Sequence, residues 1–227
     1  MKRKSIKLVG LTAVLLTIGL LSGCTMPDPT NKTSIDEEAT AIQSDVDLSG
    51  DWVVPSQDIS ISFGEDSTYE TNNDRSGTYT FMDQNQNFAI ADLFEHVDIF
   101  SCTDDKGEIY LDGALLGDLI IGFNEEEAVE RYYVRKGRDS VDQREIIGAW
   151  SDINSDKYDI TFNKDGTVTS AGGDGTYTMK EDPDCGTCVD VTIDDVTNTY
   201  AVVRYEKYLF LYKFGGYVMY QMAPAAE

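Results

Sequence analysis

The fold of this chain is decided by residues 158–167, which read YDITFNKDGT. Apolar and polar side chains alternate over residues 158–162, as they do in a β-strand that has one buried face. The five residues that follow are typical of a hairpin turn, in which Gly166 supplies the positive φ that closes the turn. The stretch therefore predicts antiparallel β-structure.

The same pattern occurs about one hundred residues earlier in the chain. Segments of the first copy match segments of the second, and they follow one another in the same order. The first match is Gly50-Asp51-Trp52 with Gly148-Ala149-Trp150. The others are 59–63 with 158–162, 65–68 with 164–167, 77–80 with 175–178 and, more loosely, 131–134 with 217–220. Repeats of this period indicate tandem structural units. We therefore expect two copies of one small domain.

Strand signals recur about every ten residues in both copies, with turn residues between them. In the first copy the expected strands are 59–63, 77–82, 97–102, 108–111, 119–123 and 128–135, and in the second they are 158–162, 176–179, 189–193, 199–204, 208–213 and 217–222. This spacing predicts an all-β fold of two tandem antiparallel barrels. Between the copies, a capping box from Ser140 to Gln143 predicts one short helix. Because each copy has only about ninety residues, we expect short strands and filled interiors rather than deep cavities.

The two copies, residues 48–135 and 146–222, resemble the small lipocalin-like domains of bacterial lipoproteins. The resemblance is carried by the Gly-x-Trp start, the Asp-Gly-Thr turn and the Gly-Thr-Tyr strand. It implies that Trp52 and Trp150 have structural roles, because the tryptophan packs across the barrel floor in that family, and we expect Gly50 and Gly148 to be structural as well. The first copy departs from the pattern because Glu65-Asp66-Ser67 stands where the second has Lys164-Asp165-Gly166.

The N-terminal segment predicts export from the cell. A basic start and the apolar run Leu8–Leu21 are typical of a signal peptide, and the run is short for a membrane span. The run closes with Leu21-Ser22-Gly23-Cys24, which resembles the lipobox of bacterial lipoproteins. We therefore expect lipidation at Cys24 and attachment to the outer face of a bacterial cell membrane, with an uncleaved anchor helix as the alternative. The predicted organisation is a signal peptide (1–23), a flexible acidic tether (24–47), the first repeat (48–135), a joint with a short helix (136–145), the second repeat (146–222) and a tail (223–227).

Composition favours a folded, strongly acidic exterior part. Hydrophobic residues make up 41% of the chain, aromatic residues 11%, and the formal net charge is −23. Such a charge repels nucleic acid and anionic lipid headgroups, so we expect neither as a partner.

Catalytic motifs do not emerge from the sequence. His96 is the one histidine, and there is no nucleophile elbow, metalloprotease pair or phosphate-binding loop. Asp152, Asn154 and Asp156 have the spacing that begins a calcium loop, but Lys157 stands where the loop needs glycine. This excludes an EF-hand and leaves a looser calcium site open.

The cysteines predict a structural role. Cys185 and Cys188 fall in an expected hairpin, where a local disulfide is plausible outside the cell, with free thiols or pairing with Cys102 as alternatives. A zinc site of Cys102, Cys185, Cys188 and His96 has suitable ligand types, but it would need both repeats to converge on one point. We expect no metal and no cofactor.

Tyrosines crowd the end of the chain at positions 205, 208, 212, 217 and 220, where they serve either as a contact surface or as wall packing. We therefore expect a non-enzymatic, lipid-anchored binding or interaction protein whose partner is a small molecule, a glycan or a protein. The alternative is a structural or accessory envelope lipoprotein that assembles with partner proteins. A secreted hydrolase has no supporting set of residues.

Overall fold

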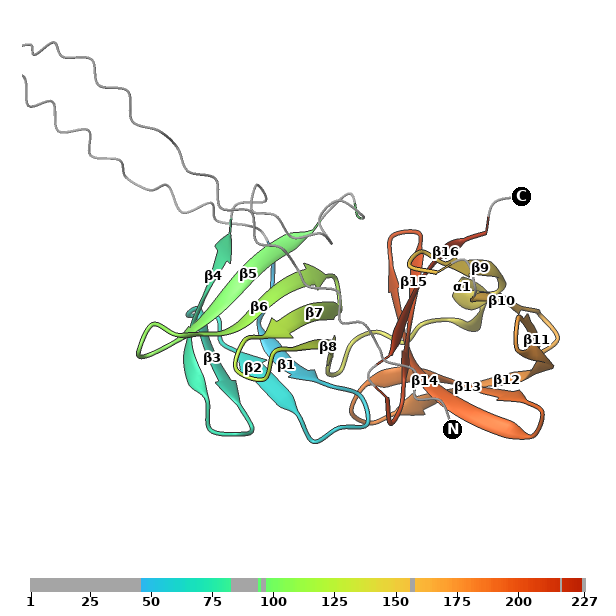
Figure 1. The fold of residues 1–227 in the computed structure, drawn as a ribbon, viewed down its shortest axis with the longest axis horizontal. Coiled ribbons are helices and arrows are strands. Elements are labelled where there is room, and N and C mark those ends of the chain that lie inside the picture. Colours follow the sequence, from blue (N-terminus) through green and yellow to red (C-terminus); the bar gives the residue numbers. More distant parts are fainter. Residues whose placement is uncertain (1–45, 83–93, 95–96, 156–157, 217, 226–227) are drawn as a thin grey trace, which may run out of the picture. The chain divides into compact units, whose positions relative to one another are not determined.

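The computed structural model describes residues 46–82, 94, 97–155, 158–216 and 218–225 (Figure 1). These residues form two closed antiparallel β-barrels of eight strands each, one after the other along the chain. The sequence-based prediction of tandem all-β barrels is therefore confirmed. Cys24, and with it the expected signal peptide and nearly all of the tether, lies outside the described residues.

In the first barrel each strand pairs with the next, and the last pairs with the first. Its strands are β1 (Gly50–Val53), β2 (Ser60–Phe63), β3 (Thr68–Thr71), β4 (Ser76–Met82), β5 (Asp98–Asp104), β6 (Ile109–Leu116), β7 (Leu119–Asn124) and β8 (Val129–Arg135). The Gly-x-Trp start corresponds to β1, but the expected strands lacked β3, which is only four residues long and follows a turn directly. The expected strand 108–111 was too short, because β6 continues to Leu116.

The second barrel repeats this plan, with β9 closing against β16. Its strands are β9 (Gly148–Asp152), β10 (Asp159–Phe162), β11 (Thr167–Ser170), β12 (Gly173–Asp182), β13 (Gly186–Ile193), β14 (Val196–Tyr205), β15 (Tyr208–Lys213) and β16 (Met219–Pro224). The expected strands lacked β11, and they made β12 and β14 too short.

A single helical turn, α1 (Gln143–Ile146), precedes the second barrel. Its capping box joins Asp142, whose side chain accepts a hydrogen bond from the Arg144 amide, to Glu145, whose side chain accepts one from the Asp142 amide. The expected box from Ser140 to Gln143 is therefore wrong by two residues. Because Ile146 is fully buried, its packing sets where the turn lies. In the described part of the chain, no helix has the length and apolar character needed to cross a membrane.

Each barrel has a buried tryptophan held in the same way. The indole Nε1 of Trp52 donates to the Leu48 carbonyl at 3.0 Å, and that of Trp150 donates to the Ile146 carbonyl at 2.7 Å. An arginine guanidinium covers each indole ring, from Arg135 in the first barrel and from Arg204 in the second. Arg135 belongs to β8, the last strand of the first barrel, whereas Arg204 belongs to β14, the sixth strand of the second. The same contact between an arginine and the tryptophan is therefore made from strands at different positions in the two barrels.

The glycine two positions before each tryptophan has a backbone that other residues rarely adopt. Gly50 has φ of +108° and Gly148 has φ of +136°. A side chain at either position would strain the backbone. This explains why Gly-x-Trp recurs at the start of both barrels.

Candidate functional site

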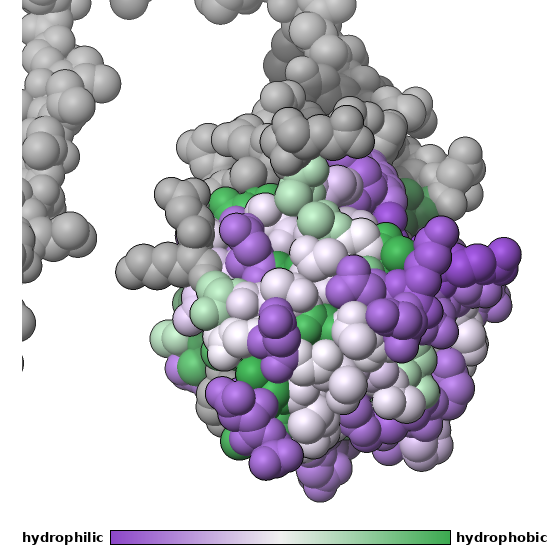
Figure 2. Space-filling model, turned by 90° about the vertical axis from the view of Figure 1, so that its right-hand side faces the viewer, coloured by the Kyte–Doolittle hydropathy of each residue, from purple (hydrophilic) through white to green (hydrophobic). Residues whose placement is uncertain are grey.

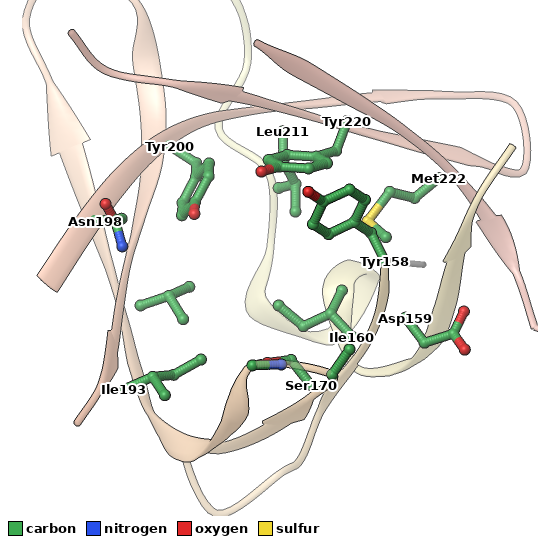
Figure 3. A pocket seen from close by; sticks show the side chains of 13 residues that line it. Tyr158, Asp159, Ile160, Ser170, Ile193, Asn198, Tyr200, Leu211, Tyr220 and Met222 are labelled. Carbon is green, nitrogen blue, oxygen red and sulfur yellow. The ribbon is translucent and has the colours of Figure 1, made fainter. Parts of the chain in front are cut away.

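A pocket of about 420 Å³ opens in the second barrel (Figure 3). Its lining comes from β10, β11, β13, β14, β15 and β16 and from the residues next to β10 and β11, so one end of the barrel itself forms the pocket. The volume falls within the range of small-molecule sites in proteins.

The inner part of the pocket is apolar. Val191, Leu211 and Met222 are buried and belong to the core of the second barrel. Ile160 and Ile193 are half-buried and extend this apolar surface toward the opening. A ligand in the pocket therefore contacts hydrocarbon side chains at the inner end of the pocket and along one side of it.

Three tyrosines form the other side of the pocket, facing Ile160 and Ile193 across it (Figure 3). The rings of Tyr158 and Tyr220 have centroids 5.2 Å apart and are inclined by 61°, and those of Tyr200 and Tyr220 are 6.1 Å apart and inclined by 60°. Because the outer rings are both tilted against the central ring of Tyr220, the three rings form an angled aromatic wall, which we call the tyrosine wall.

The pocket also holds polar groups without protein partners. Among the described residues, the hydroxyls of Tyr158, Tyr200 and Tyr220 make no hydrogen bond, and neither does the side-chain amide of Asn198. Asp159 also belongs to the lining, but its carboxylate points away from the pocket (Figure 3). An apolar cavity with a few convergent polar groups is the usual form of a ligand site.

Two of the tyrosine hydroxyls have pKa values raised above the ordinary value, at which a tyrosine is already protonated at neutral pH. Burial, and secondly the proximity of Tyr220, raises the pKa of Tyr200 above its ordinary value. Burial, followed by the nearby Tyr158 and Asp152, likewise raises the pKa of Tyr220. Both hydroxyls are therefore neutral hydrogen-bond donors at physiological pH.

The pocket corrects the expectation that both barrels are filled. The pairing of Phe81 with Phe100 in the first barrel corresponds to the pairing of Met179 with Val189 in the second, so a phenylalanine inside the first barrel is replaced by a smaller valine.

The corresponding end of the first barrel is packed with aromatic rings. Tyr69 and Tyr110 are buried and stacked, with centroids 5.8 Å apart and planes inclined by only 11°. The guanidinium of Arg75 pairs with the Glu126 carboxylate at 2.5 Å, linking the β3–β4 and β7–β8 turns. The two copies thus differ at the same end: rings fill the first barrel there, and rings line an opening in the second.

The residues expected to be structural lie away from this pocket. Trp52 and Trp150 are buried in their barrels, and neither lines the pocket. Cys185 and Cys188 are buried thiols whose Sγ atoms are 3.6 Å apart, and Cys102 is a buried thiol in the first barrel. The disulfide stays a prediction.

Several expected candidates cannot be placed. His96, Asp156, Lys157 and Tyr217 lie outside the described residues, as does Cys24. Among the residues that the structure describes, no three His, Cys, Asp or Glu side chains are grouped to hold a metal ion.

The sequence reasoning singled out Tyr220 but missed Tyr158, Tyr200 and Asn198 as site residues. A signal was present, because Asn198 and Tyr200 are two positions apart and so share one face of a strand. Which face they share depends on the register of β14 against β13 and β15, and this register is a tertiary property.

Comparisons with protein-family models, with curated proteins and with solved structures give no significant match. The candidate site therefore rests on its geometry.

Proposed function

We propose that this chain is a non-enzymatic binding protein whose second barrel holds a small molecule in the pocket beside the tyrosine wall. The observation that carries the proposal is the combination of an apolar floor with hydroxyl and amide groups that have no hydrogen-bond partner among the described residues. Each of these groups can donate or accept a hydrogen bond, so a bound molecule can pair with them without displacing a described protein group. The contrast with the first barrel supports the same proposal, because the pocket at the corresponding end of that barrel is smaller, about 230 Å³, and is lined mostly by charged residues.

We further propose that the protein works on the outer face of a bacterial membrane, attached through a lipid on Cys24. The support is the sequence Leu21-Ser22-Gly23-Cys24 and the apolar run before it. The acidic, polar segment that follows would then space the barrels from the bilayer.

Small-molecule binding is favoured over a protein partner by the surface as well. A broad exposed apolar patch is typical of a docking surface. The face drawn in Figure 2 carries hydrophilic side chains over much of its described area, and its hydrophobic side chains are gathered in small patches. The pocket, by contrast, combines a mainly apolar lining with polar side chains of Tyr158, Tyr200, Tyr220 and Asn198.

A thermal-shift screen tests this function. A ligand that binds only the folded chain raises its melting temperature. The full chain, held in a non-ionic amphiphilic polymer, is heated with each member of a diverse library of water-soluble small molecules, and unfolding is followed by tryptophan fluorescence. Two variants are measured beside it: Ile193→Trp, which fills the pocket from its half-buried wall, and Ile109→Trp, the same change at an exposed position of the first barrel.

We expect a related group of compounds to raise the melting temperature of the native chain and of Ile109→Trp, and to leave Ile193→Trp unchanged. The proposal fails if no compound stabilises the native chain, or if the same compounds stabilise all three chains equally.

A further inference from the structure

The charges around the pocket are unbalanced. Asp159 is the one charged residue among the described residues that line it, and its carboxylate points away from the cavity. Asp152 ends β9, and Asp194 and Asp195 form the turn between β13 and β14, so all three stand at the same end of the barrel. Within the described residues, the one positive side chain at a strand end beside the pocket is Lys213, which pairs with Tyr200 in the sheet. Most of the described charges at this end of the barrel are therefore negative.

The tyrosine wall has the shape and the electronic character that an organic cation prefers. The face of an aromatic ring is the negative end of its quadrupole, and it attracts ammonium and guanidinium groups within about 6 Å. In the wall, two rings are inclined by about 60° to a third, so more than one ring can approach the same group. Tyr158 is 51% exposed, which places this attraction at the opening as well as inside.

We infer that the pocket binds a small organic cation, an ammonium or quaternary ammonium group on an apolar body, with its charge against the tyrosine wall and its body against Ile160, Ile193 and Met222. This inference rests on the proposed function and names the class of ligand. Among the described lining residues there is no arginine or lysine to pair with an anion. A neutral apolar molecule would fill the floor but would gain nothing from the acidic opening.

Three water-soluble molecules of similar shape separate these classes. Phenyltrimethylammonium carries the charge, 2-phenylpropan-2-ol is a neutral near-isostere, and benzenesulfonate is an anion. Each is titrated by calorimetry into the full chain in a non-ionic amphiphilic polymer, with the polymer alone as the blank. The dissociation constant for the cation should be about tenfold or more below that for the alcohol, the size expected of a partly desolvated cation–π contact. The sulfonate should give no binding heat.

Two further measurements test whether the charge of the ligand and the ring of Tyr158 cause the preference for the cation. Binding of the cation should weaken as salt rises, whereas binding of the alcohol should not. Tyr158→Phe keeps the ring and should change the affinity for the cation by less than about twofold, whereas Tyr158→Leu should lower it about threefold or more. Because Tyr158 is half-exposed, neither variant should disturb folding. Phe123→Leu, at an exposed ring in the first barrel, is the matched control and should have no effect.

The outcomes separate the ligand class from the function itself. If the alcohol binds as tightly as the cation and Ile193→Trp abolishes both, the pocket is a binding site and the inferred cation preference is wrong. Tightest binding by the sulfonate, or no binding by the cation, overturns the inference as well. The function itself fails only when the library screen described above also fails.

Discussion

The guanidinium carbon of Arg204 lies 4.8 Å from the centroid of the Trp150 ring. The same guanidinium donates to the Tyr208 carbonyl at 2.7 Å, which holds it at the turn between β14 and β15. Burial lowers the pKa of Arg204 from its ordinary value, although the group stays charged at physiological pH. The tryptophan, its hydrogen bond to Ile146 and the covering arginine stabilise the barrel at a distance from the pocket lining.

Trp150→Ala should therefore destabilise the chain strongly. Emptying a buried aromatic site costs about 3–5 kcal/mol. The free energy of unfolding, measured by denaturant titration and circular dichroism, should fall by this amount. Phe123→Ala, which removes an exposed ring, should cost much less. If the free energy of unfolding fell by less than about 1 kcal/mol in Trp150→Ala, the indole would not be a main contributor to the stability of the core.

Arg138 should be needed to attach the joint to the second barrel. Its guanidinium donates to the carbonyls of Cys185, Thr187 and Val202, at distances from 2.5 to 3.3 Å. Charged hydrogen bonds of this kind contribute about 1.5–3 kcal/mol, so Arg138→Ala should lower the free energy of unfolding by about that much. Arg138→Lys keeps the charge but lacks the planar set of donors, and should recover only part of the loss.

The control for this prediction is Arg144→Ala, because the Arg144 side chain is exposed and forms an ion pair with Asp142 as its one partner among the described residues. Its unfolding transition should stay close to that of the native chain. Equal losses for Arg138→Ala and Arg144→Ala would contradict a special role for the three carbonyl contacts.

Cys185 and Cys188 should form a local disulfide when the protein is exported. Their Sγ atoms are 3.6 Å apart, and three cysteines cannot all pair within one chain, so Cys102 should stay a thiol. The hydrogen bond between the Cys185 and Cys188 thiols, and secondly burial, raises the pKa of the Cys185 thiol. Burial also raises the pKa of the Cys102 thiol. Alkylation of the exported protein should therefore be done in denaturant, followed by digestion and mass spectrometry.

The expected result is alkylated Cys102 with the other two cysteines protected. The loop that they close is very short, so the stabilisation is only about 2–3 kcal/mol or less. Replacing both by serine should lower the melting temperature modestly and keep both barrels. Alkylation of both Cys185 and Cys188 would reject the disulfide.

Cys24→Ala should block attachment to the membrane. The substitution removes the thiol that accepts the lipid. Cells fed a labelled fatty-acid analogue should label the native chain and not the variant, with Cys102→Ala as the matched control that keeps its label. Label retained on Cys24→Ala would contradict the lipoprotein prediction.

The fold was predictable from the sequence because its signals are local and repeated. The alternation at residues 158–162, the turn around Gly166 and the recurrence of Gly-x-Trp each specify antiparallel structure within a few residues. The pocket was not predictable in this way. It depends on Val189 standing where the first barrel has Phe100, and on the register that turns Asn198 and Tyr200 toward Tyr220. Such differences of volume and register appear only when all eight strands are placed together.

Methyl NMR spectroscopy tests the central claim most directly. The full chain in a non-ionic amphiphilic polymer, labelled at isoleucine, leucine, valine and methionine methyl groups, is titrated with phenyltrimethylammonium. We predict that the signals of Ile160, Ile193 and Met222 shift with a single saturating curve, while those of Ile61, Ile99 and Leu111 in the first barrel stay where they are. Shifts confined to the first barrel, or spread evenly over both barrels, would contradict a ligand site in the second.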